Sequence, residues 1–158
     1  MRFIFDLDHT VIDSSHRQAT LPNGDLDLAH WFENATPEMI AKDSLLPLAA
    51  EWRKARNAGA EIVVCTARTM QLADFYYLRD HGLEYDAMLS RPEGNMITDA
   101  ALKYLSLYHY ATRVKEQRWK TFCAFSIMFD DNKNVIEGLN RKGLRVYNAL
   151  EINKRLAA

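Results

Sequence analysis

The stretch Phe3-Ile4-Phe5-Asp6-Leu7-Asp8-His9-Thr10 decides how this chain is expected to fold. Its opening residues are apolar and aromatic, so residues 2–6 are interpreted as a short buried β-strand. Two carboxylates, Asp6 and Asp8, stand where that strand ends. This pattern predicts a buried central strand with functional acidic residues at its carboxyl end.

Segments typical of strands and helices alternate along the rest of the chain. Further strands are expected at residues 61–66, 86–89, 125–130 and 144–148. Apolar periodicity, with a glycine or a capping residue at one end, predicts helices over residues 46–58, 69–81, 98–110 and 132–142. This order predicts an α/β fold, a three-layer Rossmann-like parallel sheet of about five strands with helices on both faces. Ligands bind such sheets at the carboxyl ends of the strands.

Residues 7–45 do not follow the alternation. They contain the turn residues Pro22-Asn23-Gly24 and then a polar stretch that runs through Thr36-Pro37. We interpret residues from about 11 to 45 as a small insertion over the sheet edge, a minimal cap that leaves the site rather open. No repeat or linker divides the 158 residues, so we expect one domain, residues 1–158.

Composition excludes several classes of protein. The formal net charge of −1 argues against the diffuse basic surface of a tight, non-specific nucleic-acid binder. Two cysteines cannot form a disulfide framework or a four-ligand zinc site, and a reducing cytoplasm is the simplest setting. Neither a signal peptide nor a long apolar membrane span is expected.

Acidic residues end two of the predicted strands. Asp6 and Asp8 follow the first, and Asp130 and Asp131 follow the strand at residues 125–130. The carboxyl ends of parallel strands open onto one edge, so neighbouring strands bring these acids together. Like charges at close range need a cation, and oxygen ligands suit Mg²⁺. We therefore predict a Mg²⁺ site formed by Asp6, the Asp8 backbone carbonyl and Asp130, with Asp131 assisting.

The spacing of Asp6 and Asp8 has a chemical interpretation. Both can approach one substrate phosphate, where one carboxylate attacks phosphorus and the other acts as general acid and base. Taken alone, the two acids could equally be turn residues that follow a strand. Thr66 ends another predicted strand and offers a hydroxyl to a phosphoryl oxygen, with Arg68 two residues further on. Lys103 could neutralise the phosphoryl group, although in isolation it is more typical of a solvated helix.

These signals together resemble the haloacid dehalogenase-like phosphatases. Phe5-Asp6-Leu7-Asp8-His9-Thr10-Val11 is similar to the first motif of that superfamily, and the strand that ends at Thr66 is similar to the second. Lys103 fits the third motif and Asp130-Asp131 the fourth. The resemblance implies a phosphatase that uses Mg²⁺ and an aspartyl-phosphate on Asp6, with Asp8, Thr66 and Lys103 also catalytic.

A narrower resemblance links the chain to the 3′-phosphatase domain of bacteriophage polynucleotide kinase-phosphatase. Arg17 and Arg68 match arginines that follow the first two motifs, and Asp99 matches an acid that pairs with the third-motif lysine, here Lys103. This implies removal of 3′-phosphates from nucleic-acid ends, as in nucleic-acid repair, with Arg17, Arg68 and Asp99 binding the substrate. The resemblance is to a bacteriophage protein, but the source organism stays open; the expected location is the cytoplasm, which is the host cytoplasm if the source is viral.

Two departures keep other functions open. No kinase phosphate-binding loop occurs, so free nucleotides are an alternative substrate, which would make the protein a (deoxy)nucleotidase or another small-molecule phosphatase. His9 stands where the first motif usually has glycine. An inactive binding module that keeps the fold is a third possibility, disfavoured by the joint presence of the four motifs. The basic stretch at residues 113–120, with Trp119, favours a solvated helix end over a nucleic-acid contact.

Overall fold

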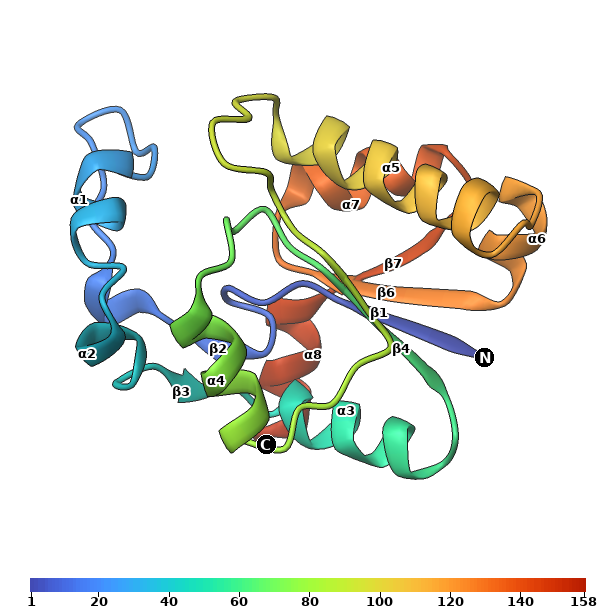
Figure 1. Ribbon diagram of the computed structural model, residues 1–158, viewed down its shortest axis with the longest axis horizontal. Helices are drawn as coiled ribbons and strands as arrows, with labels where there is room; N and C mark the ends of the chain where they lie inside the picture. The colour runs from blue at the N-terminus through green and yellow to red at the C-terminus, as the bar shows by residue number, and fades with distance from the viewer.

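A parallel five-stranded sheet with the order β5-β4-β1-β6-β7 forms the centre of the computed structural model, which describes residues 1–158 (Figure 1). The strands are β1 (Arg2–Phe5), β4 (Glu61–Cys65), β5 (Ala87–Leu89), β6 (Ser126–Asp130) and β7 (Arg145–Asn148). All five predicted strands are therefore confirmed, and so is the α/β fold class. Strand β1 lies between β4 and β6, which places the ends of these three strands side by side.

Helices cover both faces of the sheet. Successive residues of each strand point to opposite faces, and both sets of side chains are apolar, so each face needs a covering layer. Phe5, Ile62 and Val64 pack against one set of helices, α3 (Leu48–Asn57), α4 (Leu72–Asp80) and α8 (Ala149–Leu156). Their neighbours Ile4 and Val63 pack against the other set, α5 (Asp99–His109), α6 (Trp119–Ala124) and α7 (Lys133–Arg141). A one-turn π-helix, Tyr110–Val114, continues α5. The three layers match the expected architecture.

The helices of the predicted alternation are present, but four others were not predicted: α1 (Leu28–Glu33) and α2 (Pro37–Ile40) in the insertion, and α6 and α8 further along the chain. Helix α6 is short, and its sequence was interpreted only as the end of a basic helix. Helix α8 begins at Asn148, whose side chain accepts a hydrogen bond from the Leu150 amide. On α8, the buried Asn153 accepts a hydrogen bond from the Leu48 amide (2.8 Å) and donates one to the Thr10 carbonyl (2.9 Å). The last helix thus fastens the loop that follows β1.

The insertion between β1 and α3 is a small structured layer at the carboxyl ends of the strands (Figure 1). It contains β2 (Ile12–Asp13), a 3₁₀ turn (Ser15–Arg17), α1 (Leu28–Glu33), α2 (Pro37–Ile40) and β3 (Ser44–Leu45). Strands β2 and β3 pair antiparallel. Both helices begin at side-chain caps, Asp27 and Thr36, which accept bonds from backbone amides. None of the helices in the protein has the length and apolar composition needed to cross a membrane.

Candidate active site

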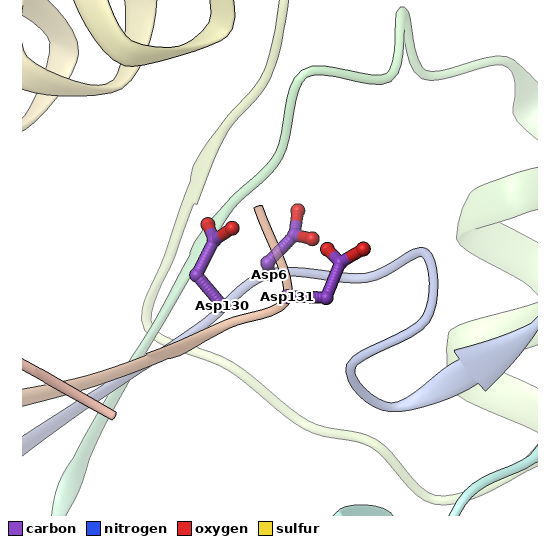
Figure 2. Close-up of side chains that lie close together, drawn as sticks. All are labelled: Asp6, Asp130 and Asp131. Atoms are coloured by element: carbon purple, nitrogen blue, oxygen red, sulfur yellow. The ribbon is translucent and has the colours of Figure 1, made fainter. Parts of the chain in front are cut away.

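Three carboxylates meet where β1 and β6 end. Asp6 directly follows β1, and its amide donates a hydrogen bond to the Phe129 carbonyl of β6 (3.1 Å), which fixes the two strand ends together. Asp130 ends β6 and Asp131 follows it. One oxygen from each of Asp6, Asp130 and Asp131 lies within 4.8 Å of the others, and Figure 2 shows their side chains gathered at this edge. The structure therefore brings together these three predicted acids.

Lys103 is the counter-charge inside this cluster. Its ammonium group reaches from α5 to Asp6 Oδ1 (2.9 Å) and to Asp130 Oδ2 (2.6 Å), and its side chain is only 2% exposed. Burial alone lowers the pKa of Lys103, but the carboxylates of Asp6 and Asp130 outweigh it and raise the pKa well above its usual value. Lys103 is therefore a charged, buried lysine and not the solvated helix residue that its sequence context alone favoured.

One lysine does not balance three carboxylates. Burial, followed by repulsion from Asp6, raises the pKa of Asp130 to about 7 and that of Asp131 to about 8. Raised pKa values mean that the nearby positive charge is too small to stabilise all three carboxylates in their ionised form. The donors are all hard oxygens gathered at one point, which is the ligand set that Mg²⁺ accepts. The residues present thus fit a bound Mg²⁺.

Asp8 faces a different partner from Asp6. Its carboxylate accepts bonds from Arg68 Nη2 (2.6 Å) and Nε (3.1 Å), and from the Ser14 hydroxyl (2.6 Å). Burial alone raises the pKa of Asp8, but the Arg68 guanidinium and the Ser14 hydroxyl outweigh it and lower the pKa below its ordinary value. Asp8 is thus held ionised beside the carboxylate cluster.

The arginines predicted to bind substrate are both buried in ion pairs. Arg68 also donates to Asp74 (Nη1–Oδ1 2.6 Å), which in turn accepts a bond from the Gln71 amide before α4. Arg17 donates to both oxygens of Asp43 (2.9 and 3.0 Å) and lies over the Trp31 ring, 4.2 Å from its centroid. Sequence reasoning missed these partners, because nothing in the spacing of the chain marks Asp43 as a neighbour of Arg17.

The predicted pairing of Asp99 with Lys103 is wrong. Asp99 is the first residue of α5 and accepts a bond from Arg91 Nη2 (2.7 Å), with a longer contact from Asn132 (3.4 Å). Lys103 instead points into the buried site, where two carboxylates attract it more strongly than a half-exposed acid one turn earlier. Thr66 is buried beside the cluster, and its Oγ1 accepts a bond from the Arg68 amide (3.0 Å), which leaves its hydroxyl hydrogen for another acceptor.

A cavity of about 990 Å³ opens above the cluster. Asp6, Asp8, Thr66 and Lys103 all contribute to its lining. Residues of the insertion form one wall, so the insertion bounds the site and does not merely leave it open. The loop between β5 and α5 contributes the residues of another wall. Catalytic candidates from three separate segments therefore share one cavity.

Two other sequence features have plain structural explanations. His9 has a φ of 58°, a left-handed conformation that glycine adopts more readily, and its ring is hydrogen-bonded to Gln18 (2.9 Å). The basic stretch at residues 113–120 lies at the opposite end of the molecule from the insertion (Figure 1). There Trp119 stacks on Phe122 and donates to the Lys142 carbonyl (2.8 Å), which agrees with a helix end whose tryptophan packs inward.

Comparisons with known proteins identify relatives of the whole chain. A family model described as bacteriophage T5 5′-deoxynucleotidase matches residues 1–158. The chain is 31% identical over 175 residues to the 5′-deoxynucleotidase of Escherichia phage T5, an alignment that covers 98% of this chain and 69% of the relative.

Solved structures share the fold at lower identity. A chain of the Pnkp1/Rnl/Hen1 RNA repair complex superposes with a TM-score of 0.60 at 18% identity. The match covers 93% of the present protein but only 41% of the chain from the repair complex. A haloacid dehalogenase-like hydrolase from Streptococcus pneumoniae has a TM-score of 0.62 at 12% identity and covers 97% of this chain and 90% of its own. These likenesses concern the fold, and the sequence shows that this chain belongs to the phage T5 5′-deoxynucleotidase family.

Proposed function

We propose that this protein is a Mg²⁺-dependent phosphomonoesterase that hydrolyses deoxynucleoside 5′-monophosphates through an aspartyl-phosphate on Asp6, with residues 1–158 acting as one domain. The observation that carries the proposal is the cluster of Asp6, Asp130 and Asp131 around buried Lys103, of which Asp6, Asp131 and Lys103 line the cavity. The substrate class is supported by the phage T5 relative, which is named a 5′-deoxynucleotidase.

In this mechanism a carboxylate oxygen of Asp6 attacks phosphorus and the bond between phosphorus and the nucleoside oxygen breaks. Asp8 supplies a proton to that departing oxygen, so the nucleoside leaves as a neutral alcohol. A water molecule then attacks the phosphorus of the aspartyl-phosphate and gives its proton to Asp8. Inorganic phosphate is released and both acids return to their starting states.

Positive charge at the reacting phosphate comes from two sources. Lys103, with the Thr66 hydroxyl as a donor, stabilises the negative oxygens of the phosphoryl group. Asp6, Asp130, Asp131 and the Asp8 backbone carbonyl would hold Mg²⁺. When bound, this ion supplies the charge that lets an anionic nucleophile approach an anionic phosphate.

Asp8 must be protonated to act as an acid, whereas Arg68 stabilises its ionised form. An incoming phosphate competes for the same guanidinium, because arginine binds phosphate and carboxylate oxygens in the same bidentate manner. Substrate binding can therefore release the Asp8 carboxylate from Arg68, so that Asp8 takes up a proton from water before it acts as the acid. This gives Arg68 a role that its ion pairs alone do not reveal.

The other candidate substrate is a 3′-phosphorylated nucleic-acid end. Binding it would require positive charge beyond that needed for the reacting phosphate, because the neighbouring phosphodiester of the strand must be bound as well. Arg17 and Arg68 were expected to supply that charge. Arg17, however, is bonded to both oxygens of Asp43. Arg68 is bonded to Asp8 and Asp74, and in the proposed mechanism it binds the reacting phosphate itself. The local charge is thus matched to one phosphate, which favours a mononucleotide over an oligonucleotide.

A substrate panel tests the proposal. The purified protein with Mg²⁺ is given deoxynucleoside 5′-monophosphates, 3′-monophosphates, and 3′- and 5′-phosphorylated oligonucleotides, and phosphate release is measured. We expect the highest kcat/KM with the 5′-deoxynucleotides. A higher value for the 3′-phosphorylated oligonucleotide would reverse the order of the two candidates, and no hydrolysis of any substrate would indicate an inactive binding module.

A further inference from the structure

Large apolar side chains are exposed around the mouth of the cavity. On α1, Phe32 is 60% exposed, and Leu28 beside it is also exposed. In the loop between β5 and α5, Met96 is 77% exposed and Ile97 is exposed as well. All four contribute to the cavity lining. Exposed apolar groups that gather at a concave site mark a place where apolar surface of a ligand is bound.

These side chains come from two separate elements that flank the site. Figure 1 shows α1 and the loop between β5 and α5 standing apart from each other at the carboxyl ends of the strands. The acids and Lys103 lie deeper, at the ends of β1 and β6. The cavity is therefore polar at its base and apolar toward its mouth. Its volume of about 990 Å³ exceeds what a phosphate group alone needs and lies in the range of sites for drug-sized ligands.

Both walls are held in place before any ligand arrives. Helix α1 is capped by Asp27, which accepts a bond from the His30 amide (3.1 Å), and its Trp31 is held beneath Arg17. Arg91 fixes the opposite loop by donating to the carbonyls of Ala67 (3.0 Å) and Ile97 (2.7 Å). Because these walls are already ordered, they lose little conformational entropy when a ligand binds. Burial of their apolar surface can therefore contribute to the binding free energy.

We infer that the base of the nucleotide is bound at this mouth, with its ring against Phe32 on one side and Met96 on the other. The inference rests on the proposed nucleotidase function and adds the residues that recognise the nucleoside. An aromatic ring stacks on a base, and a flexible thioether packs against the opposite side of a flat ring. The base is thereby the part of the substrate that separates nucleotides from simpler sugar phosphates.

The test compares two substrates that share a phosphate and a sugar but differ in the base. The kcat/KM for dTMP and for 2-deoxyribose 5-phosphate is measured with Mg²⁺ for the unaltered protein, Phe32→Ala and Met96→Ala. Phe125→Ala is the matched control, because Phe125 is also 60% exposed but does not line the cavity. Since these side chains are exposed, the substitutions should leave the fold intact.

We expect the unaltered protein to prefer dTMP. Phe32→Ala should reduce that preference about 5- to 150-fold, which is the value of one base–aromatic stack, while hydrolysis of deoxyribose 5-phosphate stays unchanged. Met96→Ala should reduce it about 2- to 10-fold, as expected for a thioether–ring contact, and Phe125→Ala should not alter it.

Two outcomes overturn the inference without touching the proposed function. One is equal hydrolysis of both substrates by the unaltered protein, and the other is an equal loss on both substrates in Phe32→Ala. Failure of the unaltered protein to hydrolyse dTMP, while a phosphorylated oligonucleotide is hydrolysed, refutes the proposed function and the inference with it.

Discussion

Replacing Lys103 with methionine should destabilise the protein far more than replacing an exposed lysine. The Lys103 side chain is 2% exposed and contacts two carboxylates at 2.9 and 2.6 Å. Removing one partner of a buried ion pair costs about 3–5 kcal/mol, because the remaining charges stay buried without compensation. For a domain of this length each kcal/mol lowers Tm by about 2–4 °C, so Lys103→Met should lower Tm by about 6–20 °C.

The measurement is thermal unfolding in EDTA at pH 8, with Lys115→Met as the control. Lys115 pairs with Glu61 at 3.1 Å, but its side chain is 35% exposed, and such pairs contribute at most about 1 kcal/mol. The control should therefore lose no more than about 4 °C. Equal losses in the two variants would refute the assignment of Lys103 as the counter-charge of the acidic cluster.

The pH and the metal provide two internal checks on the same variant. Burial and the nearby Asp6 raise the pKa of Asp130 to about 7, so at pH 6 this carboxyl is mostly protonated and the loss in Lys103→Met should be smaller. Mg²⁺ should restore part of the Tm at pH 8, because it replaces the missing charge. Turnover should stay lost, since the metal does not supply the ammonium group beside the phosphate.

Four further predictions concern the carboxylates and the ion that they would bind. Asp6→Asn should lose nearly all phosphate release while Tm is unchanged or higher, since one buried negative charge is removed; undiminished turnover would exclude the covalent mechanism. Asp8→Asn should lose about 10²–10⁴-fold in kcat with dTMP but less with p-nitrophenyl phosphate, whose leaving group needs no proton, and equal losses would contradict the acid–base role. EDTA should abolish turnover and Mg²⁺ restore it. In EDTA the Tm should fall as the pH rises from about 4 to 8. Burial and neighbouring acids raise the pKa values of Asp130 and Asp131 to about 7 and about 8, so the folded state binds more protons than the unfolded state in this window. A Tm that rises between these pH values would contradict this.

The sheet and the acids at its edge could be predicted because they depend on local pattern. Apolar runs of strand length predicted all five strands, and a parallel sheet places the ends that carry Asp6 and Asp130 on one edge. That these two strands are direct neighbours is a finding of the structure. Helix α8 was missed although it had a signal, the cap residue Asn148 followed by Leu150 and Ile152. A helical pattern near the end of a chain is easily interpreted as a tail when its packing partner is unknown.

The choice of ion-pair partners could not be predicted. Asp99 lies one helical turn before Lys103, yet it pairs with Arg91, and Lys103 pairs with acids at residues 6 and 130. Arg17 forms an ion pair with Asp43, which lies 26 residues further along the chain, near the end of the insertion. Partner choice depends on which groups are buried together, and burial is a property of the folded chain that spacing does not contain.

The bond from Asn153 to the Thr10 carbonyl joins positions 143 residues apart, and it has a consequence for how the protein matures during translation. Strand β1 and the loop that carries Asp6 and Asp8 are synthesised before β6 and α8. Strand β1 therefore becomes a central strand only once β6 has paired with it, and its loop is fastened only once α8 has formed. Pairing over such separations is slow, and an apolar strand is exposed in the meantime. Catalytic competence should therefore appear only after α8 has been synthesised and packed, and until then the Arg2–Phe5 segment exposes apolar surface that a chaperone can bind.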